Sequence, residues 1–333
     1  MIVATGLLRY TLSSLSRVVL VSLAALVLNF VIFRMMPGDP AALLLRGAAS
    51  SGSVVGQAEL NSLRAQMGFD KPLPEQFVIY LVNVFQGNLG YSFVYRQNVG
   101  PLVAGRLVNS VVLLSLGASL ATVFGVLLAV ASTWNYGTAI DKAIQLAAYA
   151  FYAMPIFWLG MICLVISVQY LHLPLPVSGM QTSGAIETPM GAIEDILLHL
   201  TIPTIVLVLG YVGQYAFIMR NLMLDVSTED YVVTARSKGL TKRNIMFGTV
   251  LRNAMPPLVT MIMLNFGFFL AGSLTTEIVF SWPGLGLLIY DSVTQREYIV
   301  LQACFLVICV CVAVFNLIAD LLCGLLDPRV RAT

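Results

Sequence analysis

Residues 230–257, which read DYVVTARSKGLTKRNIMFGTVLRNAMPP, hold the densest group of charged side chains in the sequence. Only 10% of all residues are charged, so this concentration of cations around a central glycine needs a chemical explanation. Such a segment can bind nucleic-acid phosphates, fix the orientation of a membrane protein, or dock into a groove on a partner protein. Its basic residues are Arg236, Lys238, Lys242, Arg243 and Arg252.

The sequence carries none of the motifs typical of common enzymatic chemistry. It has no G-x-x-x-x-G-K-[ST] phosphate loop, no G-x-S-x-G, no H-E-x-x-H and no glycine-rich dinucleotide loop. The five cysteines lie in apolar runs without C-x-x-C spacing, where they serve as small apolar side chains. The histidines, His172 and His199, flank one loop and are not expected to bind metal. We therefore predict no catalytic, cofactor-binding or metal site in this chain.

The composition indicates a membrane protein. The hydrophobic fraction is 59%, against about 45–50% in soluble domains. Several uncharged runs approach 20 residues, the length that crosses a hydrocarbon core of about 30 Å. We expect an all-α polytopic membrane protein, and we expect the first span to be retained because no small-x-small cleavage site follows it. The predicted spans are 17–36, 107–131, 143–171, 198–219, 255–277 and 299–323.

These spans divide the chain into three parts. Residues 1–36 form the N-terminus and first span, 37–106 an extracytoplasmic segment, and 107–333 a five-helix core with a cytoplasmic loop over 220–254. Short amphipathic helices are expected near 57–67 and 74–86. Basic residues concentrate in cytoplasmic segments of membrane proteins, which predicts that both termini are cytoplasmic. The residues that set this orientation are Arg9, Arg17, Lys142, the basic residues of loop 220–254, Arg329 and Arg331.

The basic stretch thus falls in the largest cytoplasmic loop, between spans four and five. Ser227 and Asp230 resemble a capping box, which predicts a short helix beginning near residue 228. Gly239 can end it in the left-handed conformation, and Thr241 can cap a second helix in which Lys242 faces solvent. The flanking spans disfavour DNA binding. A solvated loop that only sets topology stays open, but small residues suit a docking helix better.

The sequence YVVTARSKGL followed by LRNAMPP resembles the cytoplasmic loop of permease subunits of binding-protein-dependent ABC importers, in the dipeptide/oligopeptide/nickel branch. Thr234 stands where other branches carry glutamate. Asn88 and Phe77 replace the more usual aspartate and tyrosine of the outer segment. The strings that extend the likeness in order are MPGDP, MGFDKPLPEQF, GNLGYS, MPIFWLGM, PVSG, FSWPGLG and LDPRVR.

The resemblance implies a type I ABC importer-like fold in which the loop is a coupling helix. It implies that this helix seats in a groove on an ATP-binding cassette subunit, with the face of Ala235 and Gly239 buried against that partner. It also implies a chain that is no enzyme and holds no cofactor, because ATP and Mg bind to the partner subunits. The implied coupling residues are Tyr231, Thr234, Ala235, Arg236, Lys238, Gly239 and Leu240.

The implied assembly comprises this chain, a second homologous permease subunit, one or two ATP-binding cassette subunits and an extracytoplasmic substrate-binding protein. It lies in the plasma (inner) membrane of a prokaryote and binds no nucleic acid. The branch favours di- and oligopeptides as substrates, with nickel, glutathione or oligosaccharide as alternatives. A membrane-anchored sensor would need a soluble output domain, and the sequence offers none.

Polar residues within the predicted spans are candidates for the translocation path, although helix–helix hydrogen bonding is the commoner role of such side chains. A carboxylate at a helix centre costs about 2.5–3.5 kcal/mol on insertion scales. The scarcity of ionisable residues in the spans therefore disfavours a secondary transporter or a channel. The path candidates are Gln214, Asn265 and Asn316, and the other polar residues in the spans are Asn29, Gln145 and Asp320.

Overall fold

A computed structural model of the chain describes residues 2–35, 70–92, 94–182, 184, 188–272 and 274–326. The helix predicted near 57–67 lies outside the described residues. Among the described residues, five helices are long and apolar enough to cross a membrane, and a bent pair supplies a sixth span. The predicted all-α polytopic fold is thereby confirmed. The long helices are α1 (Ile2–Met35), α5 (Val99–Trp134), α8 (Pro189–Ser227), α11 (Leu251–Gly272) and α14 (Tyr298–Leu326).

The third span, predicted over 143–171, is a bent pair of helices whose two halves meet at 100°. Met154 between them is extended, with φ −82° and ψ 132°. The ring of Pro155 disfavours helical backbone in the residue before it, so the first half ends there although the apolar run continues. The halves are α6 (Ala139–Ala153) and α7 (Ile156–Val165), which is extended by the π-helical turn η1 (Ile166–Tyr170).

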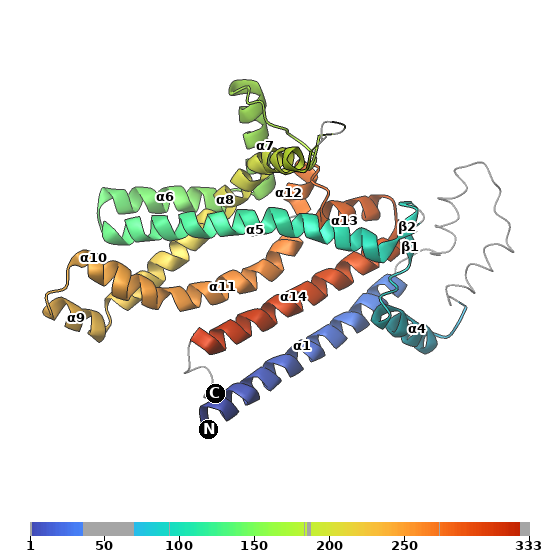
Figure 1. The fold of residues 1–333 in the computed structure, drawn as a ribbon, viewed down its shortest axis with the longest axis horizontal. Helices are drawn as coiled ribbons and strands as arrows, with labels where there is room; N and C mark the ends of the chain where they lie inside the picture. Colours follow the sequence, from blue (N-terminus) through green and yellow to red (C-terminus); the bar gives the residue numbers. More distant parts are fainter. Residues whose placement is uncertain are drawn as a thin grey trace.

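Helices α1 and α14 lie side by side and run antiparallel (Figure 1). Arg17 Nη2 donates to Asp320 Oδ2 at 3.0 Å. Toward the other end of the pair, Asn29 Nδ2 donates to the backbone carbonyl of Gln302 at 3.1 Å. Asn29 and Asp320 therefore serve helix–helix contacts, the role that the sequence favoured for such residues.

Helices α5 and α8 approach so closely that glycine is needed at their contact. A Cβ atom added to Gly125 would lie 2.6 Å from Tyr215 Cβ and 3.1 Å from the backbone nitrogen of Ala216. One added to Gly117 would lie 2.8 Å from Leu207 Cδ1. Lipid supplies no hydrophobic driving force between spans, so close backbone approach and its van der Waals contacts hold the helices together.

Helix α4 and two short strands lie at the right end of the bundle in Figure 1, and two short helices, α12 and α13, lie between that end and the middle. Helix α4 confirms the helix predicted near 74–86. The strands form an antiparallel hairpin in which Tyr91 faces Asn98 and Ser92 faces Gln97. Two short helices connect α11 to α14. These elements are α4 (Leu73–Phe85), β1 (Tyr91–Ser92), β2 (Gln97–Asn98), α12 (Leu274–Val279) and α13 (Leu285–Thr294).

Replacing Gly125 with alanine should weaken the α5–α8 contact. The new methyl group meets backbone atoms, which cannot rotate away, so we expect a loss of about 1–3 kcal/mol in stability and a lower melting temperature in detergent. Gly105→Ala in the same helix is the control, because a Cβ atom there meets nothing within 4 Å. Equal melting temperatures for the two variants would contradict the close approach.

Candidate functional site

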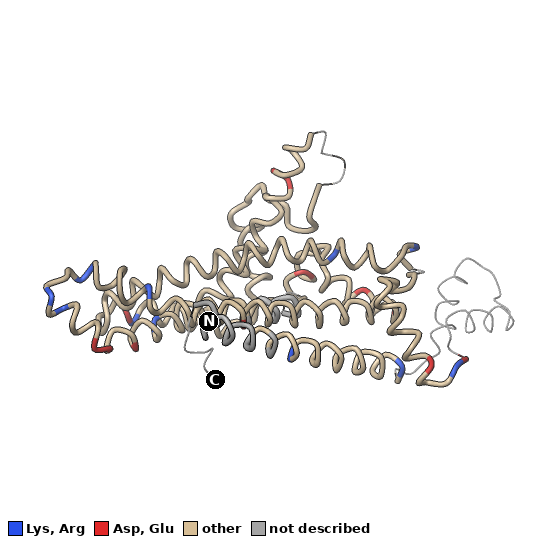
Figure 2. Tube along the Cα trace, turned by 60° about the horizontal axis from the view of Figure 1, so that its bottom comes forward, with Lys and Arg blue, Asp and Glu red and all other residues tan. Residues whose placement is uncertain are grey.

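The basic loop folds as a helix, a glycine turn and a second helix at the left end of the molecule in Figure 1, where several Lys and Arg residues gather (Figure 2). Gly239 has φ +76°, which confirms the predicted left-handed turn. The Thr241 hydroxyl accepts from the backbone N–H of Asn244 at 3.3 Å, which confirms the predicted second cap. The elements are α9 (Asp230–Ser237), α10 (Lys242–Asn244) and the π-helical segment η2 (Ile245–Val250), which continues into α11.

The predicted capping box at the start of α9 is wrong. Ser227 is the last residue of α8, and its hydroxyl donates to the carbonyl of Leu224 at 2.7 Å. Glu229 occupies the N-cap position of α9 and makes no side-chain capping bond. The span extends further toward the loop than its hydropathy indicated, so the serine was already helical.

Helix α9 has a buried face and an exposed face. Val232 is fully buried and Ala235 is 8% exposed, and both belong to the same core cluster as Ile245 and Met246 of η2. The expectation that Ala235 faces a partner is therefore wrong: η2 folds back beneath α9 and covers that face. The predicted coupling residues that lie on the surface are Tyr231, Thr234, Arg236, Lys238, Gly239 and Leu240.

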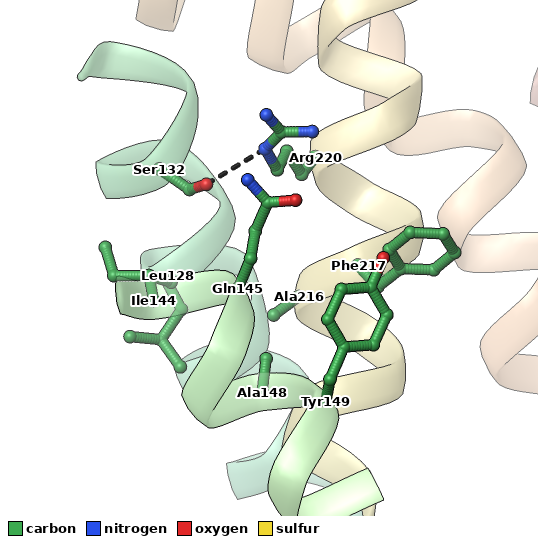
Figure 3. Close-up of a pocket in the computed structure, with 9 residues that line it drawn as sticks. All are labelled: Leu128, Ser132, Ile144, Gln145, Ala148, Tyr149, Ala216, Phe217 and Arg220. Atoms are coloured by element: carbon green, nitrogen blue, oxygen red, sulfur yellow. Dashed lines mark hydrogen bonds between the residues drawn. The ribbon is translucent and has the colours of Figure 1, made fainter. Parts of the chain in front are cut away.

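A buried ion pair that was not predicted from the sequence lies between α6 and α8 near this end. Arg220 donates from Nη2 to Asp141 Oδ2 at 3.0 Å and from Nε to Asp141 Oδ1 at 3.1 Å. The two side chains are 11% and 3% exposed. Arg220 Nε also reaches the Ser132 hydroxyl at 3.0 Å (Figure 3), and Gln145 Nε2 donates to Asp141 at 2.8 Å. Gln145 is thus a structural hydrogen-bond partner.

The cavity beside Arg220 is too small for a transported solute. It lies among the ends of α5, α6 and α8, lined by apolar side chains such as Leu128 and Ile144 together with Gln145 (Figure 3). Its volume of about 10 Å³ is room for one water molecule. The Arg220–Asp141 cluster is therefore a structural junction between helices.

A second buried carboxylate, Glu277 of α12, holds the beginning of α13. Glu277 Oε2 accepts from the backbone N–H of Gly286 at 2.7 Å and of Leu287 at 3.1 Å. Its Oε1 accepts from the Ser110 hydroxyl of α5 at 2.6 Å. The carboxylate satisfies N–H groups that a helix N-terminus leaves free and lies at the positive end of its dipole. Glu277 is fully buried, so these contacts replace water.

The same carboxylate explains part of the string FSWPGLG. A Cβ atom on Gly284 would collide with the Glu277 carboxylate, so only glycine fits there. Trp282 Nε1 donates to the carbonyl of Asn109 at 3.0 Å, and Asn109 Nδ2 donates to the carbonyl of Pro283 at 2.8 Å. The string is thus a turn that binds α12 and α13 to α5.

Comparison with known proteins identifies this architecture. The family described as binding-protein-dependent transport system inner membrane component matches residues 121–332, and its N-terminal counterpart matches residues 5–114. The chain belongs to this family. The resemblance to ABC importer permeases of the peptide branch is therefore confirmed, and the chain is a membrane-spanning transport subunit.

Relatives match this permease over nearly its whole length. The dipeptide transport system permease protein of Escherichia coli K12 is 33% identical, over 98% of this chain and 99% of its own. The di/tripeptide transport system permease protein of Pseudomonas aeruginosa is 35% identical, over 91% and 93%. The glutathione transport system permease protein of Pectobacterium atrosepticum is 34% identical, over 98% and 99%.

The predicted path residues of the permease lie on three different helices. Gln214 on α8 and Asn316 on α14 are partly buried. Asn265 on α11 lies next to the buried hydroxyl of Tyr215. The path role of all three residues stays a prediction.

The permease buries more carboxylates than the sequence indicated. Asp141, Glu277 and Glu297 are 2%, 0% and 3% exposed. Glu297, at the start of α14, accepts from the Ser92 hydroxyl at 3.2 Å and from the backbone N–H of Val94 at 2.9 Å. All three lie near helix ends, and tertiary folding rather than local hydropathy buries them.

Glu277→Ala should destabilise the contacts that hold α13 against α12 and α5. The substitution leaves the N–H groups of Gly286 and Leu287 and the Ser110 hydroxyl without their acceptor, at a cost of about 1–3 kcal/mol for each buried group. We expect a lower melting temperature of the detergent-purified protein. Glu194→Ala, on the exposed side of α8, is the control and should melt like the wild type. A Glu277→Ala protein as stable as this control would show that the carboxylate does not hold α13.

Proposed function

We propose that this chain is the membrane-spanning subunit of an ATP-driven importer of di- and oligopeptides that an extracytoplasmic binding protein delivers. Membership of the family carries this proposal. The substrate class rests on relatives whose names specify dipeptide and di/tripeptide transport. A second homologous permease and one or two ATP-binding cassette subunits complete the assembly, and these partner subunits bind ATP and Mg.

In this proposal α9 is the element that contacts the ATP-binding subunit. Its outer face presents Tyr231, Arg236 and Lys238 to solvent, while its inner face is anchored on η2. The chain connects α9 to α8 on one side and through η2 to α11 on the other. A displacement of α9 would therefore move both spans, which is how ATP-driven closure of the partner subunits would switch the permease between outward- and inward-facing arrangements.

The proposed orientation puts α9 and both chain termini on the cytoplasmic side. Basic residues concentrate on the cytoplasmic side of membrane proteins. Six of them lie between Arg220 and Arg252. Helix α1 begins and α14 ends in the same half of the molecule as α9 (Figure 1), which supports cytoplasmic termini.

Glutathione is the second candidate substrate, because one relative of 34% identity is named a glutathione transport system permease. Uptake assays in cells that lack this subunit separate the candidates, with labelled dipeptides, tripeptides, glutathione, nickel and an oligosaccharide as substrates. We expect peptide uptake to be lost and to return with the wild-type gene. Intact peptide uptake, in cells without other peptide importers, combined with loss of another substrate would refute the peptide proposal and identify that substrate.

Gly239→Ala should uncouple transport from ATP hydrolysis, because it strains the backbone of the turn without creating a side-chain clash. A Cβ atom at Gly239 meets nothing within 4 Å, but the φ of +76° costs an L-residue roughly 1–2 kcal/mol. The turn after α9 would distort, and ATP-dependent uptake should fall while the spans stay inserted. Gly248→Ala is the matched control, since its Cβ is equally unobstructed and its φ is not positive. Equal uptake by both variants would show that the left-handed turn is dispensable.

A further inference from the structure

The turn between α5 and α6, residues 135–138, lies beside α10 at the end of the molecule that carries α9 (Figure 1). We call these four residues the α5–α6 turn. Gly137 within it has φ +79°, and its backbone N–H donates to Asp141 Oδ2 at 2.9 Å. The Asp141 carboxylate therefore closes the turn and binds Arg220 at the same time.

Arg220 holds the turn from the side of α8. Besides the two bonds to Asp141, its guanidinium carbon lies 5.5 Å from the centre of the Tyr136 ring. Ser132 at the end of α5 shares its Nε donor. One guanidinium thus contacts residues before, within and after the α5–α6 turn. Arginine suits this position because its planar fork binds a carboxylate with two bonds and stacks on an aromatic ring.

Lys242, which follows α9 in the sequence, holds the end of α5 that leads into the turn. The side chain is exposed, as the sequence predicts, and its Nζ also donates to the backbone carbonyl of Trp134 at 2.8 Å. The same nitrogen lies 4.6 Å from the centre of the Trp134 ring. A cation over an indole face, bonded to a carbonyl at the negative end of α5, gains from both the ring and the helix dipole.

The two cations bracket α9 in the sequence, one on α8 and one at the start of α10. An apolar core runs between them, since Val232 and Ala235 of α9 share a cluster with Met223 of α8 and with Trp134 of α5. We propose that the α5–α6 turn is a second part of the coupling element, clamped by Arg220 and Lys242 so that α9 moves α5 and α6 together with α8 and α11.

This inference rests on the proposed function, because it assigns Arg220 and Lys242 as positioning residues for the coupling motion. Cations that only set the membrane orientation need neither burial nor specific partners. Arg220 is largely buried, and Lys242, although exposed, gives its ammonium group to the carbonyl of Trp134, the residue before the turn. The two side chains therefore constrain the turn and the end of α5 that leads into it.

The first test is the number of peptides imported per ATP hydrolysed by the reconstituted full transporter. Lys242→Met removes the cation and keeps an apolar side chain over Trp134. We expect the transport-to-hydrolysis ratio to fall about fivefold, at the lower end of coupling effects between sites, with Lys242→Arg restoring it. Arg243→Met removes the neighbouring exposed cation and should keep the wild-type ratio.

Arg220 needs a double variant, because removal of one partner leaves a buried charge that can prevent folding. Arg220→Met combined with Asp141→Leu removes both charges together. We expect assembled transporter with a lowered transport-to-hydrolysis ratio. If this variant failed to assemble, the Lys242 variants would still decide the proposal.

The second test measures motion directly. Spin labels at exposed Thr138 of the turn and exposed Ser237 of α9 report the distance between the two parts of the coupling element. We expect one distance with and without ATP in the wild-type complex, and a broadened or shifted distribution in Lys242→Met. This readout would not change for a residue that contributes only to stability.

The outcomes separate the two levels of inference. A wild-type complex without ATP-dependent uptake refutes the proposed function. If the wild type imports normally, two results would each overturn the clamp and leave the proposed function standing. One is an unchanged transport-to-hydrolysis ratio in Lys242→Met. The other is a label distance that changes when ATP binds to the wild-type complex.

Discussion

The close contact between α5 and α8 is the constraint on which the other elements depend. Spans in lipid cannot be driven together by burial of apolar surface, so they need complementary shape or polar links. Gly125 supplies the shape, because only hydrogen at that position lets the backbone of α8 approach. The Asp141–Arg220 pair holds α6 against this α5–α8 pair, and the hydrogen bonds of Glu277 and Ser110 hold α12 and α13 against α5.

The buried carboxylates Asp141 and Glu277 follow one rule with two kinds of donor. An isolated buried charge is prohibitively costly, so a buried carboxylate must find donors that replace water. Asp141 finds a guanidinium and a glycine N–H, which links two helices to a turn. Glu277 finds the N–H groups that begin α13, which orients a short helix too small to hold its own position. Each acid thus fixes the geometry of one end of the bundle.

The sequence predicted those features of the fold that a local pattern of residues determines. Hydropathy indicated the spans, Gly239 predicted the left-handed turn, and Thr241 predicted the second cap. Features that depend on contacts distant in sequence could not be predicted in this way. Burial of Ala235 requires η2 to fold back, and the Lys242 contact requires the end of α5 to lie beside α10. The bend at Pro155 carried a local signal, which the long apolar run obscured.

The Pro155 bend gives the two halves of the third span different neighbours. Before the bend, α6 packs on α8 and shares the Arg220 junction, so it belongs with the end that carries α9. After the bend, α7 still contacts α8, because a Cβ atom on Gly210 would lie 2.9 Å from Ile156 Cγ1. It also packs on α12, where a Cβ atom on Gly160 would lie 3.3 Å from Val279 Cγ1. A straight helix would carry one set of contacts along its whole length, whereas a span broken before proline joins the Arg220 junction with one half and α12 with the other.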